Sequence, residues 1–186
     1  MSRRTLVAII GDGDVGPDSP KDRLAEAMGR AVVSAGWTVL TGGRGGVMAA
    51  ACRGARSSEA YAAGATIGLL PRDDTSEANE WVDVVIPTGL GLGRNLLCAH
   101  ADAVVAIGGG AGTLIELAAA WELHRLVIAF RVDGWSGRLA DQPLDHRVRF
   151  PGTDDRVFGV DRAEEAVTMI HDRLPYYSAS HRWTVR

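Results

Sequence analysis

Short apolar runs alternate with amphipathic segments along most of the chain. The runs are rich in β-branched residues and too short for helices, so each predicts a strand that is buried on both faces. They cover residues 5–10, 37–41, 65–70, 82–86, 103–107 and 126–130. Segments with helical patterning follow several of them, at residues 20–35, 47–55, 95–101 and 113–123. This alternation predicts an α/β fold, with a doubly wound parallel sheet, helices on both faces and right-handed crossovers.

The pattern weakens after residue 130. A short helix is predicted at residues 136–139 and an edge strand at 157–160. Asp161-x-x-Glu164 has the form of a capping box, and we expect it to open a helix that Pro175 ends. No internal repeat or second apolar core is apparent. We therefore expect a single domain over residues 1–175 and a tail over 176–186.

Composition and charge restrict the classes of partner. With 186 residues and 46% hydrophobic residues, the chain can bury one full core. The net charge is −3 and no basic stripe is present, which argues against a nucleic-acid partner. No run approaches the ~18 apolar residues of a membrane span, and the two cysteines form no motif. We expect a cytoplasmic protein without a membrane or metal site.

The stretch from Asp102 to Leu123 carries the clearest chemistry. A predicted strand runs into Gly108-Gly109-Gly110-Ala111-Gly112-Thr113, and a helix follows. Such a turn directs unpaired backbone N–H groups and the positive end of a helix dipole toward one point, and glycine leaves room there. We expect an anion, above all a phosphate, to bind at this turn. The alternative is that the glycines only form a tight turn.

Two more glycine-rich junctions follow predicted strands. One is Gly42-Gly43-Arg44-Gly45-Gly46, and the other runs from Pro87 to Asn95 and contains Arg94. Arg44 is interpreted either as a phosphate ligand or as a solvated loop charge. Because the carboxyl ends of parallel strands share one edge of a sheet, these loops should meet in one crevice.

The loop after the first strand contains Gly11, Gly13 and Gly16 in the spacing of a dinucleotide fingerprint, but Pro17 and Pro20 interrupt it. We expect this loop to line the crevice without acting as a nicotinamide fingerprint. The expected ligand-binding residues are Gly11, Gly42, Gly43, Arg44, Gly45, Gly46, Thr88, Gly89, Arg94, Asn95, Gly109, Gly110, Gly112, Thr113 and Glu116.

The motifs in combination resemble a known group. Residues 109–116, GGAGTLIE, match the P-G-G-x-G-T-x-x-E signature of the Lonely Guy phosphoribohydrolases, long described as lysine-decarboxylase-like, with Gly108 in place of the proline. GGRGGVM at 42–48, EANEWVDVVIPTGLGLGRN at 77–95 and DAVVAIGGGAGT at 102–113 resemble the bacterial branch related to the molybdenum-cofactor carrier proteins. The resemblance implies a Rossmann-like fold, a homodimer or larger homo-oligomer, and a phosphate bound by the loop before Thr113.

Two functions follow from this resemblance and the crevice. The first is a binding protein for a phosphorylated purine or pterin ligand, either a nucleoside monophosphate or a molybdenum-cofactor-like molecule, that requires no further cofactor. The alternative is a nucleoside 5′-monophosphate phosphoribohydrolase, an N-glycosidic hydrolase in which the resemblance assigns Arg94 and Glu116 as the catalytic pair. Glu116 also has a structural interpretation, because Thr113-x-x-Glu116 has the spacing of a capping box. Asn95 stands where the enzymes usually have lysine, which weakens the catalytic assignment of Arg94.

Overall fold

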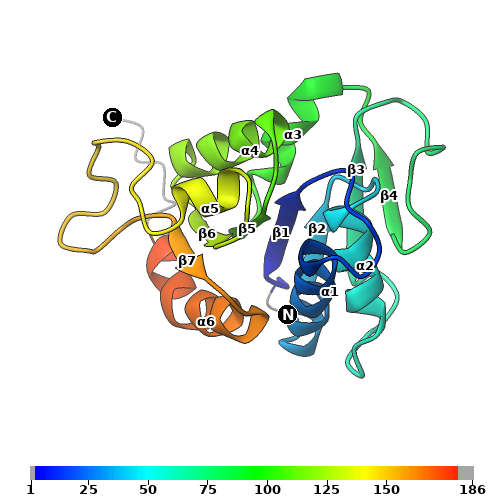
Figure 1. The fold of residues 1–186 in the computed structure, drawn as a ribbon, viewed down its shortest axis with the longest axis horizontal. Helices are drawn as coiled ribbons and strands as arrows, with labels where there is room; N and C mark the ends of the chain where they lie inside the picture. The colour runs from blue at the N-terminus through cyan, green and yellow to red at the C-terminus, as the bar shows by residue number, and fades with distance from the viewer. Residues whose placement is uncertain (1–2, 180–186) are drawn as a thin grey trace.

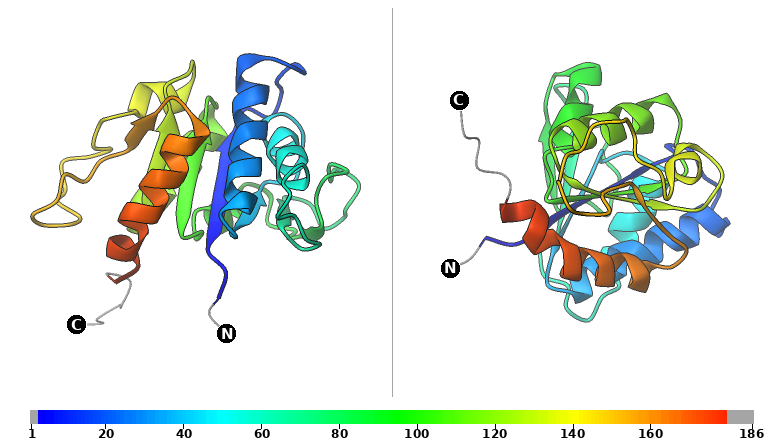
Figure 2. Two further views of the ribbon diagram at one scale, coloured as in Figure 1. Left: turned by 90° about the horizontal axis from the view of Figure 1, so that it is seen from below. Right: turned by 90° about the vertical axis from the view of Figure 1, so that its left-hand side faces the viewer.

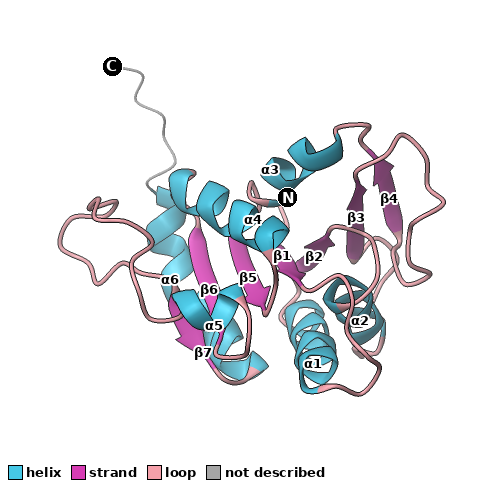
Figure 3. Ribbon diagram, turned by 45° about the horizontal axis from the view of Figure 1, so that its top comes forward, coloured by secondary structure: helices cyan, strands magenta, loops and turns pink. Residues whose placement is uncertain are grey.

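The computed structural model describes residues 3–179, which form one parallel sheet of seven strands covered by helices (Figure 1). The strand order is β4-β3-β2-β1-β5-β6-β7. The strands are β1 (Leu6–Gly11), β2 (Thr38–Thr41), β3 (Thr66–Leu70), β4 (Val84–Pro87), β5 (Ala103–Ile107), β6 (Leu126–Phe130) and β7 (Phe158–Val160). Each paired strand runs parallel to its neighbour, so all carboxyl ends lie at one edge (Figure 3). The predicted doubly wound α/β fold is confirmed.

Helices pack on both faces of this sheet. The helices are α1 (Pro20–Ser34), α2 (Val47–Arg56), α3 (Arg94–Cys98), α4 (Ala111–Glu122), α5 (Trp135–Leu139) and α6 (Ala163–Ala179), and a 3₁₀ turn, η1 (Gly91–Gly93), precedes α3. Helices α1, α2 and α6 cover one face, and α3, α4 and α5 cover the other (Figure 1).

The core follows from the two-residue period of the strands. Val7 and Ile9 of β1 face the core shared with α1, α2 and α6, whereas Ala8 and Ile10 face the core shared with α3 and α4. Trp121 of α4 is fully buried in the second core, as expected for a packing residue. Both faces of the central strands are therefore apolar, which explains the continuous hydrophobic runs in the sequence.

Helix boundaries confirm one predicted signal and correct another. Ser19 caps α1, since its hydroxyl accepts a hydrogen bond from the amide of Asp22, and Pro20 is the first helical residue. Pro175, however, does not end α6, which continues to Ala179. Tyr177 in that last turn is buried and its hydroxyl donates to Asp155, so packing offsets the hydrogen bond that proline removes. The rest of the predicted tail, residues 180–186, lies outside the described residues.

The segment between α5 and β7 contains no helix or strand and projects beyond the sheet (Figure 2). Arg149 anchors it. Its guanidinium pairs with Asp155 at 2.8 Å and stacks on the ring of Trp121, 3.4 Å from the ring centre. This side chain is almost fully buried and also donates to the carbonyl of Trp121 at 2.7 Å, so the stack and this hydrogen bond attach the segment to α4, whereas Asp155 pairs the charge from within the segment. None of the described helices is long and apolar enough to cross a membrane.

Candidate ligand-binding site

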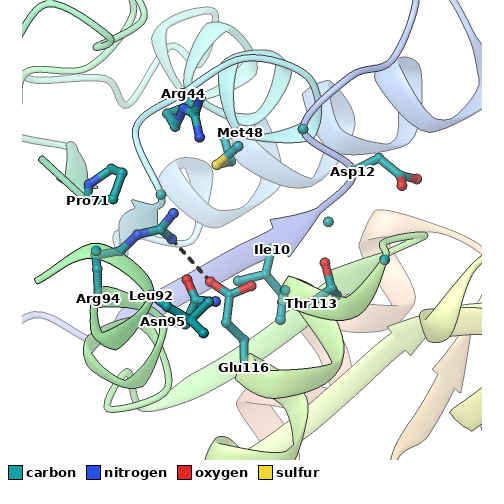
Figure 4. A pocket seen from close by; sticks show the side chains of 16 residues that line it. Ile10, Asp12, Arg44, Met48, Pro71, Leu92, Arg94, Asn95, Thr113 and Glu116 are labelled. Atoms are coloured by element: carbon teal, nitrogen blue, oxygen red, sulfur yellow. Dashed lines mark hydrogen bonds and ion pairs between the residues drawn. The ribbon is translucent and has the colours of Figure 1, made fainter.

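A pocket opens at the carboxyl ends of β1, β2, β3 and β5 (Figure 4). Its volume is about 540 Å³, which lies within the usual range for small-molecule sites. The chain leaves β1 toward β2 on one side and returns to the other side through β5. The pocket therefore lies at the topological switch point, where doubly wound sheets bind their ligands. We call it the ligand pocket.

The N-terminus of α4 opens into the ligand pocket. The helix begins at Ala111 after Gly110, and no side chain caps it. The first amides of a helix have no partner within the helix, and Gly110, Gly112 and Thr113 line the pocket. A side chain on Gly110 would meet no atom within 4 Å, so the approach to these amides is open. The turn predicted to bind an anion therefore lines an open part of the pocket, and its anion binding remains a prediction.

The amide of the first residue of this turn, Gly108, is paired within the fold and does not face the pocket. Gly108 donates its N–H to the hydroxyl of Ser136 at 2.7 Å, and this hydroxyl in turn donates to the carbonyl of Phe130. Trp135 and Ser136 donate their amides to the carbonyls of Gly109 and Gly108. The start of α5 therefore holds the glycine turn on the side away from the pocket, and the unpaired first amides of α4 lie on the pocket side.

Arg94 and Glu116 form an ion pair in the wall of the ligand pocket (Figure 4). Nη1 of Arg94 lies 3.2 Å from Oε1 of Glu116, and the two side chains are only 10% and 8% exposed. Burial raises the pKa of Glu116 to about 7, although Arg94 and Cys98 act in the opposite direction. Nε of Arg94 is buried and has no acceptor among the described residues. The pocket thus holds a carboxyl group that titrates near neutral pH beside a fixed cation.

The capping-box interpretation of Glu116 is wrong. Because α4 begins at Ala111, Thr113 already lies inside the first turn and Glu116 lies in the second turn, too far along to cap the helix. Its carboxylate turns toward Arg94 and the pocket instead. Glu116 is therefore a pocket residue held by an ion pair.

Arg44 lies at the rim of the ligand pocket and pairs with an acidic residue. It lines the ligand pocket, yet half of its side chain is exposed and its Nε lies 3.2 Å from a carboxylate oxygen of Glu77. Glu77 also pairs with Arg72 at 3.3 Å. Arg44 is thus a partly exposed loop charge with a partner, and its contact with a phosphate remains a prediction.

The structure brings together nine of the predicted ligand-binding residues. Those that line the pocket are Gly11, Gly42, Arg44, Arg94, Asn95, Gly110, Gly112, Thr113 and Glu116. Those that do not line it are Gly43, Gly45, Gly46, Thr88, Gly89 and Gly109. The ligand contacts of both groups remain predictions.

Packing explains why several of these glycines face away from the pocket. Gly43 has φ +75°, and a side chain there would meet Leu70. Gly46 has φ +63°, and a side chain there would collide with the carbonyl of Asp12, which accepts the first amide of α2 at 2.9 Å. The N-terminus of α2 is therefore closed by the loop after β1. The glycines after β2 serve close backbone packing more than ligand access.

Sequence reasoning missed the apolar walls of the pocket. Ile10, Met48, Pro71 and Leu92 line it, together with Asp12, Gly13 and Gly91. These four apolar side chains can pack against a flat heterocycle. They can therefore distinguish ligands by their rings, which a phosphate-binding loop alone cannot do. Leu92 carried a signal in the sequence, because it is a large apolar residue between two glycines of a predicted loop. In the structure 67% of this residue is exposed, as expected for a contact surface.

Known proteins are similar to this chain in sequence or in structure. A protein of Archaeoglobus fulgidus, described as uncharacterized, is 35% identical over 126 residues, which are 67% of this chain and 79% of that relative. The molybdenum cofactor binding protein from the phototrophic bacterium Rippkaea orientalis is 31% identical, with a TM-score of 0.76 over 92% of this chain and 98% of that chain. The molybdenum cofactor carrier protein from Chlamydomonas reinhardtii is 28% identical, with a TM-score of 0.74 over 92% of this chain and 99% of that chain.

These similarities agree with the motifs that pointed to the Lonely Guy and molybdenum-cofactor carrier group, and they confirm that resemblance. Residues 4–167 match the SLOG cluster4 family. This matched range contains all seven strands, the glycine turn and every residue of the ligand pocket. The chain belongs to the SLOG cluster4 family.

Proposed function

We propose that this protein binds a phosphorylated pterin or purine in the ligand pocket and carries it without chemical change. The observation that carries the proposal is the uncapped N-terminus of α4, which opens onto a pocket with apolar walls. A phosphate monoester accepts hydrogen bonds from the amides around Gly112, where the helix dipole also favours negative charge. The ring of the ligand packs against Met48, Pro71 and Leu92.

The molybdenum cofactor, a phosphorylated pterin, is the ligand that we place first. Two similar structures are named for binding or carrying it. The donors of the ligand pocket fit such a molecule, because the buried Nε of Arg94 has no acceptor of its own and the helix amides are free of side-chain caps. Glu116, which titrates near neutral pH, is suited to the amino and ring N–H groups of a pterin or guanine.

Two measurements test this proposal. Protein purified from cells that make the cofactor is analysed for bound molybdenum by mass spectrometry and for pterin by fluorescence after oxidative extraction. Calorimetry then follows the addition of AMP and GMP to the protein after the ligand has been removed. We expect either a near-stoichiometric pterin content or saturable heat with a nucleotide. The proposal is overturned if the purified protein contains neither pterin nor molybdenum and also binds neither nucleotide.

The Gly110→Ala variant tests whether the phosphate binds at the N-terminus of α4. Its added methyl group faces the opening of the pocket and touches no other described atom within 4 Å, so the fold should be retained. We expect the variant to lose most of the bound ligand. Equal ligand content in the variant and the parent protein would place the phosphate elsewhere.

A second candidate function is N-glycosidic hydrolysis of a nucleoside 5′-monophosphate. The buried Arg94–Glu116 pair favours it, because a carboxylate beside the anomeric carbon can stabilise the positive charge that develops on the ribose. Water then cleaves the N-glycosidic bond, its oxygen bonding to the anomeric carbon and a proton passing to the base. Free base and ribose 5-phosphate are released. Incubation with AMP and with cytokinin-type monophosphates, followed by chromatography, tests this function. Activity that persists in Glu116→Ala would exclude Glu116 as its catalytic residue.

We also propose that the protein acts as a cytoplasmic homo-oligomer. Val84, Ile86, Leu90, Leu92, Leu96, Leu97 and Ile115 are exposed apolar residues on or beside β4, η1, α3 and α4, and we propose that they form one apolar face. Leu92 belongs to this face and to the rim of the ligand pocket, so a second copy seated here would also narrow the entrance. Large exposed apolar patches mark association surfaces. Cys52 and Cys98 are buried free thiols, in keeping with a reducing compartment.

A further inference from the structure

A second cavity lies beside the ligand pocket, on the other side of the loop that follows β1. Val15, Pro20 and Lys21 line one wall, and Val132 and Asp133 after β6 line the other. Its volume is about 470 Å³, close to that of the ligand pocket. We call it the side cavity. The β1 loop contributes to both cavities, since Asp12 and Gly13 line the ligand pocket and Val15 lines the side cavity.

One ion pair separates the two cavities. Nζ of Lys21 lies 2.6 Å from Oδ2 of Asp12, and the two side chains are 24% and 27% exposed. Asp12 belongs to the ligand pocket and Lys21 to the side cavity. Lys21 is the only lysine in the sequence. An ammonium group has three N–H donors, so Lys21 can hold the carboxylate of Asp12 and a phosphate oxygen at the same time.

The same ion pair rests on the start of the glycine turn. Gly108 has φ +66°, and a side chain there would meet the carboxylate of Asp12 and Nζ of Lys21. Proline, whose φ is fixed near ~−65°, does not fit this backbone. Glycine at position 108, where the motif has proline, therefore leaves the space that the ion pair of Asp12 and Lys21 occupies. This ion pair positions Lys21 beside Gly108, which lies two residues before Gly110, the residue that precedes α4.

The geometry points to a ligand that spans both cavities, an inference that rests on the proposed function of the ligand pocket. The first ring occupies the ligand pocket, and a pyrophosphate crosses from the N-terminus of α4 to Lys21. A second flat ring lies in the side cavity, between Val15 and Pro20 on one side and Val132 on the other. Asp133 there can accept hydrogen bonds from an amino group of that ring. The ligand class is a dinucleotide, or a phosphorylated pterin joined through pyrophosphate to a nucleoside.

The position in the sheet supports this class of ligand. Doubly wound sheets bind dinucleotides across the switch point, with one half on each side. The ligand pocket reaches toward β2 and β3, whereas the side cavity reaches toward β6, on the other side of β1 and β5. A mononucleotide fills only the first of these volumes. The carboxylate of Asp12 would repel a phosphate at this crossing if Lys21 did not neutralise it.

Calorimetry with three guanine compounds tests the inference on the full chain. GMP supplies one ring and one phosphate, GDP adds the second phosphate, and diguanosine pyrophosphate adds the second ring. We expect GDP to bind severalfold more tightly than GMP, and diguanosine pyrophosphate at least tenfold more tightly than GDP. Lys21→Met should remove the gain from GMP to GDP. Val132→Trp should remove the gain from GDP to the dinucleotide and leave the affinity for GMP unchanged.

Val15→Trp repeats the test from the opposite wall, in case Val132→Trp perturbs the fold, and circular dichroism checks both variants. Diguanosine pyrophosphate that binds no more tightly than GDP overturns the inference, and so does a gain that survives both tryptophan variants. GMP binding without such a gain leaves the proposed function standing. If none of the three compounds binds, the inference that a second ring occupies the side cavity is also rejected. The proposed function is then decided separately, by the pterin and molybdenum content of the purified protein.

Discussion

Arg94 and Glu116 face each other from α3 and α4, and their charged groups lie 3.2 Å apart where almost no water reaches them. The pair connects the five-residue helix α3 to α4, the helix whose uncapped N-terminus opens onto the ligand pocket. Burial of Glu116 outweighs the attraction of Arg94, because its pKa rises to about 7 from an ordinary value of 4.5. The charge state of the pocket therefore changes near physiological pH.

Stability should fall with rising pH because of Glu116. The raised pKa means that the folded protein holds a proton that the unfolded chain releases above about pH 4.5. The contribution is fully present below pH 4.5 and is lost as the pH rises through 7, and its upper limit is of the order of 3 kcal/mol. Glu116→Gln should remove this dependence. Urea unfolding of both proteins at several pH values between 4.5 and 8 measures it, and parallel curves would contradict the raised pKa.

Removal of Arg94 should raise the pKa of Glu116 further. Arg94 is the main influence that lowers this pKa against the effect of burial. In Arg94→Met the carboxyl group should stay protonated beyond pH 7, which a titration of the side-chain carbon by NMR records directly. Arg44→Met is the control, since Arg44 pairs with Glu77 and not with Glu116. An unchanged titration in Arg94→Met would show that the two groups are not coupled in solution.

Alanine at two glycines should separate ligand binding from folding. Gly110→Ala should change the free energy of unfolding by less than about 0.5 kcal/mol and weaken phosphate-ligand binding at least tenfold. Gly46→Ala should lower the free energy of unfolding by about 2 kcal/mol or more, because its φ is +63° and the new carbon would strike the carbonyl of Asp12. Chemical denaturation and calorimetry distinguish the two effects. A stability loss at Gly110 as large as that at Gly46 would refute the open approach to α4.

A charge on the apolar face should separate the subunits of the proposed oligomer. Leu96 is 50% exposed within this face. Leu96→Glu should convert the assembly to monomers, as measured by light scattering after gel filtration, because an interface does not bury an unpaired carboxylate without a large cost. Val148→Glu is the matched control, since Val148 is 76% exposed in the loop after α5 and lies outside the face. A monomeric parent protein would contradict the proposed assembly.

Much of the architecture was predictable because local patterns and global packing agree. The apolar runs at residues 103–107 and 126–130 correspond residue for residue to β5 and β6. Ser19 and Pro20 marked the start of α1 correctly. Such signals arise from nearest-neighbour chemistry, which a sequence displays directly.

The errors arose where tertiary contacts override local signals. Pro175 lies within α6 because burial of Tyr177 holds the last turn in place. Thr113 and Glu116 have capping-box spacing, but the helix starts two residues before Thr113 because glycine allows the chain to turn earlier. Neither outcome is visible in a window of neighbouring residues.

The candidate site was predictable only in part. The convergence of strand ends placed Arg94, Glu116 and the turn at Gly110 in one pocket, as expected. Glycines such as Gly43 and Gly46 gave the same sequence signal for a different reason, since they allow neighbouring backbones to approach each other. The ion pair of Asp12 and Lys21 depends on a loop conformation that no local motif specifies.

The placement of β1 also affects how the protein is made. β1 is the first strand of the chain, yet its two neighbours in the sheet are β2 and β5. A nascent chain that has left the ribosome only as far as α3 can pair β1 on one side, and the other edge stays unpaired until residues 103–107 emerge. During that interval an apolar strand edge is open to chaperones and to other nascent chains. Slowed translation between α3 and β5 would prolong this exposure and increase aggregation.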